Sequence, residues 1–123
     1  MTRDDMQRFA EEWIAAWNRR DLDAVLAPFA DDARFTSPRA VAILGTATAT
    51  DKATLRRYWQ AALDRHHTLV FTLYRVLCDV ERREMVVVYE RNLNGEKGRA
   101  CELMRFDEAG RQIEGEAMYG ALV

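Results

Sequence analysis

The dipeptide Asn94-Gly95 constrains the fold of this 123-residue sequence more than any other feature. It stands between two segments in which apolar residues alternate with polar ones, 85–93 and 97–107. A two-residue hairpin turn needs positive φ at both central positions, and Asn and Gly adopt such φ values readily. The pattern therefore predicts an antiparallel hairpin in which Leu93 pairs with Glu96.

This register divides the side chains of the hairpin between the two faces of a sheet. One face is predicted to carry Met85, Val87, Tyr89, Arg91, Ala100, Glu102, Met104 and Phe106, and the other Val86, Val88, Glu90, Arg99, Cys101, Leu103 and Arg105. Both faces are substantially apolar, so both are expected to be covered. The helices of this chain can cover only one of them. We expect the other to form a homodimer interface through its apolar residues, which are Val86, Val88, Cys101 and Leu103.

The first half of the chain shows helical periodicity, with apolar side chains at three- and four-residue spacing. Thr2 is expected to cap a first helix and Asp21 a short second one. A third helix is predicted behind a cap at Thr50 or Asp51, with its end near His66-His67. Paired histidines can suggest a metal or acid–base site, but adjacent residues on a helix diverge in direction. We therefore favour an interaction of the pair with the helix dipole.

The second half has a period of two, which predicts an antiparallel meander with strands at about 69–80, 85–93, 97–107 and 111–121. Before the third helix, Asp31-Asp32 is interpreted as a turn and Ala33 to Ser37 as a short strand. The segment 39–50 is interpreted either as a lid or binding loop, or as a short edge strand with a bulge at Gly45.

The expected fold class is therefore α+β, in a single domain over residues 1–123. Three amino-terminal helices would pack on a strongly curved antiparallel sheet that forms a cone with an internal pocket.

Composition excludes several function classes. Lys and Arg together number 18 against 20 Asp and Glu, so the chain lacks the basic excess expected of a nucleic-acid-binding protein. No signal peptide or membrane span is predicted, and we expect a cytoplasmic location. Cys78 and Cys101 fall within predicted strands and are interpreted as buried free thiols. No residues have the spacing of zinc ligands, and no cofactor is expected.

Glu102 is the candidate for acid–base chemistry, because it places a carboxyl group on an otherwise apolar inner face. Two interpretations remain open. It has a structural role, through an ion pair with Arg91 or a hydrogen bond to an indole or phenol, or it faces a ligand. The aromatic residues expected to point towards the same core either pack it densely or leave an apolar pocket. They are Trp13, Trp17, Phe29, Phe35, Trp59, Tyr89 and Tyr119.

The segment Trp13 to Asp23, followed by Phe29 to Ala33, resembles the opening of the nuclear-transport-factor-two-like superfamily. This superfamily includes ketosteroid isomerase, scytalone dehydratase and the SnoaL-like polyketide cyclases. Leu55 to Trp59 resembles the third helix of SnoaL-like members, and Phe106 to Arg111 with Ala117 to Gly120 resembles their final hairpin. The resemblance spans nearly the whole chain and implies a cystatin-like roll. It does not specify an activity, because the superfamily hosts many chemistries and many non-enzymes.

The isomerase site is only partly matched. Its general base, an aspartate before a proline, corresponds to Ser37, which has no accessible basic form at neutral pH. Its oxyanion tyrosine corresponds to Trp13, which keeps one N–H donor. Its buried, protonated aspartate corresponds to Glu102. The resemblance thus implies a carbonyl clamp without the base, and the catalytic groups of the dehydratase and the cyclase have no clear counterparts.

Two hypotheses from different classes follow. The first is a homodimeric small-molecule-binding SnoaL-like domain that grips an apolar, carbonyl-bearing ligand, with isomerase, cyclase or lyase chemistry if Glu102 acts as acid or base. The second is a non-enzymatic, dimeric protein-association module with a filled or vestigial pocket. Neither involves nucleic acid or a membrane. For the first, the ligand-binding residues would be Trp13, Trp17, Phe35, Ser37, Trp59, Tyr89, Arg91, Met104 and Tyr119.

Overall fold

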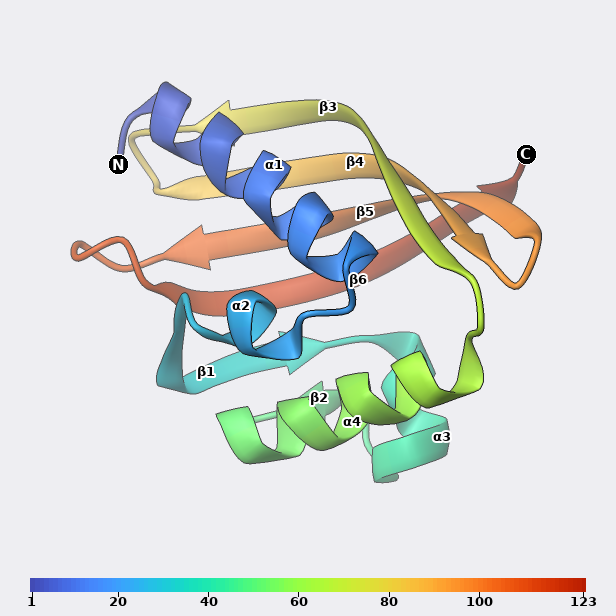
Figure 1. Cartoon of the computed structure of the whole chain (residues 1–123). Coiled ribbons are helices and arrows are strands. Elements are labelled where there is room, and N and C mark those ends of the chain that lie inside the picture. Colours follow the sequence, from blue (N-terminus) through green and yellow to red (C-terminus); the bar gives the residue numbers. More distant parts are fainter.

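Six strands form one curved sheet in the order β2-β1-β6-β5-β4-β3 (Figure 1). The structure is a computed structural model that describes residues 1–123. The predicted meander consists of β3 (Leu69–Asp79), β4 (Glu84–Leu93), β5 (Glu96–Phe106) and β6 (Gln112–Leu122). Beyond it, β1 (Phe29–Thr36) runs parallel to β6 and antiparallel to the short β2 (Thr48–Ala49). The predicted α+β class is confirmed, and the sheet is not closed into a barrel.

The Asn94-Gly95 turn has the predicted geometry and register. Asn94 has φ 55° and Gly95 has φ 90°, Leu93 pairs with Glu96, and Val87 lies opposite Glu102. All eight residues predicted for the inner face are buried, whereas those predicted for the outer face are partly buried or exposed. The alternation of the strands therefore predicted correctly which side chains enter the core.

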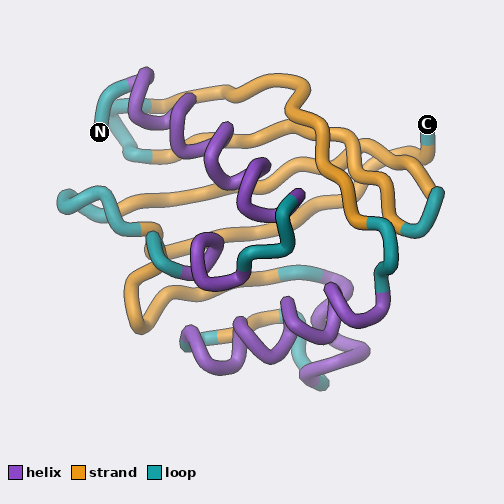
Figure 2. The backbone as a smooth tube through the Cα atoms, in the orientation of Figure 1, coloured by secondary structure: helices purple, strands orange, loops and turns teal.

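Three helices match the predicted ones, namely α1 (Arg3–Asn18), α2 (Leu22–Leu26) and α4 (Lys52–Arg65). Thr2 caps α1 in a reciprocal arrangement with Asp5, and Asp51 caps α4. Figures 1 and 2 show these helices on one side of the sheet, with α1 over β3 and α4 beside β1 and β2. The apolar core lies between the helices and the concave face of the sheet.

The interpretation of Asp31-Asp32 as a turn is wrong, because both residues lie within β1. Their side chains are exposed, while those of Ala30 and Ala33 on either side are buried. The pairing of β1 with β6 is irregular between Phe29 and Arg34. Such an irregularity lets two consecutive side chains face solvent without ending the strand.

The segment 39–50 combines short helical turns with an edge strand. The 3-10 helix η1 (Pro38–Ala40) leads into α3 (Val41–Leu44), which ends at Gly45 with φ 76°. A left-handed glycine is a common helix terminator. The predicted bulge at Gly45 is therefore wrong, whereas the predicted edge strand is confirmed as β2, which pairs with β1.

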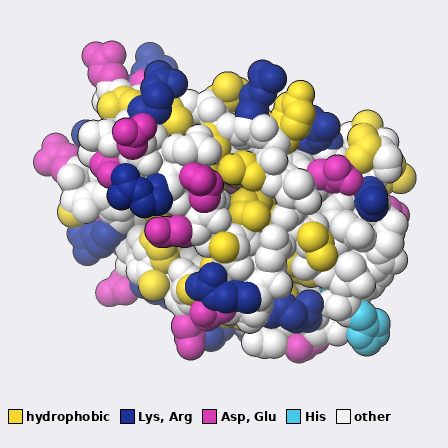
Figure 3. Space-filling view, turned by 45° about the horizontal axis from the view of Figure 1, so that its top comes forward, with side chains coloured by type: hydrophobic (Ala, Val, Ile, Leu, Met, Phe, Trp, Pro, Cys, Tyr) yellow, Lys and Arg dark blue, Asp and Glu magenta, His cyan; other side chains and the backbone are white.

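The surface carries charges of both signs and two free thiols. Positive and negative side chains are interspersed on the face seen in Figure 3. Cys78 and Cys101 are only half-buried, contrary to the expectation of burial. The reason is that Cys78 belongs to the edge strand β3 and Cys101 points to the face away from the helices. None of the helices combines the length and the apolar character that crossing a bilayer requires.

Asn94 also ties the hairpin to the end of α4. Its Oδ1 accepts a hydrogen bond from the Thr68 backbone N–H, and its Nδ2 donates to the Arg65 carbonyl oxygen, each at 3.1 Å. We predict that Asn94→Ala lowers the free energy of unfolding by about 2 kcal/mol, since alanine loses these bonds and is strained at positive φ. Asn94→Gly, which keeps the turn geometry, should lose about 1 kcal/mol. Urea denaturation measures both, and equal losses would contradict a separate contribution of the turn geometry.

Candidate functional site

A cavity of about 70 Å³ lies between α1, α4 and the concave face of the sheet. Of its lining residues, Arg39 is exposed, and Ala62, His66, Phe71, Leu93 and Tyr119 are half-buried. We refer to Arg39, His66 and Tyr119, the polar members of this set, as the mouth of the cavity. The volume is about half of the roughly 150 Å³ that accommodates a benzene molecule in an apolar cavity. A ring-sized ligand therefore requires side chains at the mouth to move.

Aromatic rings from both helices and the sheet build the walls. Trp13 and Trp17 are four residues apart on α1, so both indoles lie on the same face of the helix. The Trp17 ring packs edge-to-face on Trp59 of α4, with ring centroids 5.3 Å apart. The Trp13 ring packs in the same manner on Tyr89 of β4, also at 5.3 Å. Such contacts fix the orientation of the rings around the cavity.

The structure brings most of the predicted site residues together. Those that line the cavity are Trp13, Trp17, Phe35, Trp59, Tyr89, Arg91, Glu102 and Tyr119. Two others do not. Ser37 is fully buried with its hydroxyl 3.0 Å from that of Tyr58, and Met104 is fully buried in the core. Ser37, which corresponds to the isomerase base, therefore forms a structural hydrogen bond and lies outside the cavity.

Seven lining residues were not predicted from the sequence, namely Arg39, Tyr58, Ala62, His66, Leu69, Phe71 and Leu93. Arg39 belongs to the segment without a clear period. Phe71 follows the alternation that begins at Leu69, but a register shift after Leu73 interrupts that pattern along β3. Tyr58 and Ala62 belong to the apolar stripe of α4, and this position could have indicated their place at the cavity.

His66 belongs to the mouth instead of acting only at the helix end. Its Nδ1 lies 3.3 Å from Asn94 Nδ2. Burial, together with nearby positive charges that include Arg39, holds the pKa of the imidazole below its ordinary value. His66 is therefore neutral at pH 7. No group of three or more His, Cys, Asp and Glu side chains is arranged to hold a metal ion.

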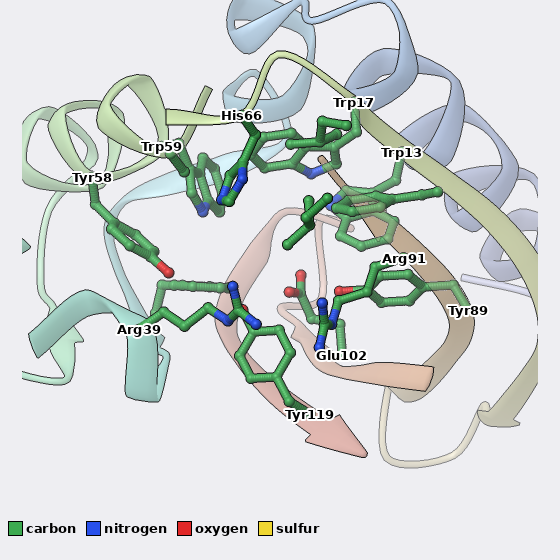
Figure 4. A pocket seen from close by; sticks show the side chains of 15 residues that line it. Trp13, Trp17, Arg39, Tyr58, Trp59, His66, Tyr89, Arg91, Glu102 and Tyr119 are labelled. Atoms are coloured by element: carbon green, nitrogen blue, oxygen red, sulfur yellow. The ribbon is translucent and has the colours of Figure 1, made fainter. Parts of the chain in front are cut away.

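Glu102 lies at the inner end of the cavity, where its side chain is 5% exposed. Figure 4 shows its carboxyl group among Arg91, Tyr89 and Trp13. Burial alone raises the pKa of this carboxyl from 4.5 to about 8, so it is mostly protonated at pH 7. The ion pair with Arg91 that the sequence left open is not formed. Arg91 Nη1 instead lies 3.5 Å from Glu96 Oε1.

Several buried donors around the cavity have no hydrogen-bond partner. They are the indole Nε1 atoms of Trp13 and Trp17 and the Nε and Nη1 atoms of Arg91. The other structural role considered for Glu102 is a hydrogen bond to an indole or phenol, and these indoles do not form one. Buried polar atoms in folded proteins nearly always have a partner. The cavity is thus rich in donors that remain available.

Residues 10–114 match the SnoaL-like domain family. The chain belongs to this family. A SnoaL-like protein of unknown function from Burkholderia thailandensis is 31% identical, with a TM-score of 0.86 and 98% of each chain covered. An NTF2-like protein of unknown function from Burkholderia pseudomallei is 21% identical, with a TM-score of 0.81 over 98% of this chain and 92% of that one. A search of curated proteins found no match.

A more distant structure with this fold is that of TerC, which was co-crystallised with polyporic acid. It is 13% identical, with a TM-score of 0.72 over 89% of this chain and 86% of that one. Together, these matches confirm the predicted superfamily and its SnoaL-like branch. The family contains several chemistries, so the activity has to be argued from the cavity itself.

We predict that Glu102→Gln changes how the stability of this SnoaL-like domain depends on pH. The folded state keeps a proton on Glu102 up to about pH 8, whereas the unfolded chain releases it near the ordinary pKa of 4.5. The wild type should therefore lose about 1.4 kcal/mol of stability per pH unit in this window. Below pH 4.5 the carboxyl is protonated in both states and costs the folded state nothing. Above about pH 8 the full loss of stability has occurred.

Urea denaturation of wild type and Glu102→Gln at pH 5 and pH 8 measures the difference. The glutamine variant should gain stability relative to wild type as the pH rises. Glu108→Gln, a substitution at an exposed turn residue, is the matched control. Parallel stability profiles for wild type and Glu102→Gln would contradict a buried, protonated carboxyl.

Proposed function

We propose that this SnoaL-like protein binds a small, largely apolar molecule through a carbonyl or related oxygen. The observation that carries this proposal is the pair of buried indole N–H groups, Trp13 Nε1 and Trp17 Nε1, that lack partners beside a cavity. A ligand oxygen is an acceptor that would satisfy such donors. The aromatic walls supply the apolar contacts that hold the body of a ligand.

The protonated Glu102 carboxyl suits the same ligand. A neutral carboxyl group can donate a hydrogen bond to a carbonyl oxygen and so stabilise negative charge that develops there. The position of the isomerase base, Ser37, lies outside the cavity. The site therefore supports binding and polarisation of a carbonyl group, with Glu102 as the acid in any isomerase, cyclase or lyase step.

The small cavity volume is the main argument for the alternative, a protein-association module with a filled pocket. Two observations favour ligand binding instead. Arg39 is exposed at the mouth, so its side chain can move aside and enlarge the space. In addition, TerC, which shares the fold, was co-crystallised with a small molecule, polyporic acid.

We predict that at least one member of a panel of steroids, aromatic ketones and fatty acids binds saturably. Isothermal titration calorimetry gives the affinity, and quenching of tryptophan fluorescence gives an independent readout. Trp13→Phe and Trp17→Phe keep an aromatic ring but remove the unpaired donor, so each should weaken binding about fivefold. Phe35→Leu is the control, because Phe35 also lines the cavity but has no hydrogen-bond donor to lose. The absence of binding across the panel would favour the association module.

We also propose that the outer face of the sheet forms a homodimer interface. Val86, Val88, Cys101 and Leu103 are only partly buried, and Leu77 and Met118 are among the exposed large apolar residues. Such a face without helical cover is a surface that a second copy can bury.

Leu103→Glu should convert the dimer to a monomer, because a desolvated carboxylate in the interface would be unpaired. Light scattering after size exclusion measures the mass. Val41→Glu, which changes an exposed valine of α3 instead, should leave the dimer intact. A wild type that is already monomeric at micromolar concentration would refute this assignment.

A further inference from the structure

We propose that the ligand carries a negatively charged oxygen group, a carboxylate or comparable organic anion, and that Arg91 binds this group. The inference rests on the proposed function and specifies the chemical class of the ligand. It follows from the surroundings of Arg91, from its place opposite Gly98 and from a second arginine at the mouth.

Arg91 is a buried cation without an adequate partner. Its side chain is 4% exposed, and its Nε and Nη1 atoms have no hydrogen-bond partner. Its one ion pair is with Glu96, with 3.5 Å between Nη1 and Oε1, and the Glu96 side chain is 59% exposed. Burying a guanidinium group is costly unless an anion and hydrogen-bond acceptors compensate it. A ligand anion would supply both.

Gly98 makes room for the guanidinium group. It lies directly opposite Arg91 in the pairing of β4 with β5. A Cβ atom at position 98 would lie 2.8 Å from Arg91 Nη2, closer than Cβ atoms are found to approach, and 3.0 Å from Cζ, which is a tight contact. The guanidinium group therefore occupies the space that glycine leaves, and this close approach to the β5 backbone fixes its place in the cavity wall.

A second cation lies at the same ring of the mouth. The Cζ atom of Arg39 is 4.5 Å from the centroid of the Tyr119 ring, and that of Arg91 is 5.5 Å from it. Figure 4 shows both guanidinium groups beside Tyr119, with Glu102 deeper in the cavity. Arg39 forms none of the ion pairs found in the chain. Two positive charges gathered at one ring are best compensated by an anion between them.

The other polar groups of the cavity do not supply this anion. Glu102 is mostly protonated at pH 7, because burial raises its pKa to about 8. Burial also raises the pKa values of the Tyr58 and Tyr89 hydroxyls, so both remain protonated. Guanidinium and indole N–H groups only donate hydrogen bonds. A ligand whose oxygens only accept, such as a carboxylate, matches this set, and arginine binds carboxylates well.

The test compares two probes that differ in charge and have nearly the same shape, benzoate and benzamide. Calorimetric titration of the full-length wild type at pH 7 should show benzoate binding at least about tenfold tighter than benzamide. A second pair, hexanoate and hexanamide, repeats the comparison with an aliphatic chain in place of the aromatic ring. An equal preference for the carboxylate in both pairs would show that the preference depends on the negative charge and not on the ring.

Three variants connect the preference to Arg91. Arg91→Met should remove the preference for benzoate over benzamide. Gly98→Ala should reduce the preference as well, because the added Cβ displaces a flexible guanidinium group. Arg39→Gln, at an exposed position, should reduce it about threefold. Arg75→Met removes an exposed arginine that does not line the cavity and should change nothing.

The outcomes separate this inference from the proposed function. If wild type binds benzoate and benzamide equally, or only neutral ketones, the anion-binding role of Arg91 is refuted and ligand binding stands. If neither these probes nor the ketone panel binds, both proposals fail. If Arg91→Met does not fold, Gly98→Ala and Arg39→Gln still decide, because a preference that is unchanged in both variants refutes the inference.

Discussion

The pairing register of β4 with β5 places Arg91 and Glu102 inside the molecule, at the cavity. Because successive residues of a strand face opposite sides, a slip of one strand by one residue would move its residue, Arg91 or Glu102, to the outer face. Asn94 secures this register in two ways. Its backbone adopts the positive φ of the tight turn, and its side chain binds Arg65 and Thr68 at the end of α4. The turn that closes the hairpin thus also positions the helix that closes the cavity.

The cavity combines groups that weaken the folded state with walls that strengthen it. The Arg91 guanidinium group and two indole N–H groups lack full hydrogen bonding in the interior, and each unsatisfied group costs roughly 1–3 kcal/mol. The packed rings of Trp13, Trp17, Trp59 and Tyr89 offset part of this cost. A core selected only for stability would replace the polar groups by apolar ones. Their presence is what supports the proposal that the interior binds a ligand.

Sequence reasoning succeeded where short-range chemistry decides the structure. The turn residues, the caps at Thr2 and Asp51 and the alternation in β4 and β5 predicted the meander, the main helices and the inner face. It failed where a local irregularity replaced a regular pattern. The aspartates of β1 lie beside an irregular pairing, and Gly45 ends a helical turn that is too short to show a period.

The candidate site was predicted in part for a similar reason. Regular strands and helices supplied Trp13, Tyr89 and Glu102, and these residues line the cavity as expected. Arg39 comes from η1 and His66 from the end of α4, and their positions depend on tertiary packing that no periodicity reveals. The ion-pair partner of Arg91 was not predicted either, although the register contained the information. Gly98 lies opposite Arg91, and Glu96 is nearer to Gly98 along β5 than Glu102 is, so the ion pair forms with Glu96.

The position of Gly98 has a consequence for reading other sequences. Arg91 stands three residues before the Asn-Gly turn, and Gly98 stands three residues after it. In any hairpin closed by a two-residue turn, these two positions face each other across the strands. An arginine and a glycine at mirror distances from such a turn are therefore a pattern visible without coordinates, and it marks a place where a sheet can carry a cation flat against its own backbone. Chains with the same turn and a bulkier residue in place of the glycine lack that space, so this one position should separate charged from uncharged interiors among otherwise similar folds.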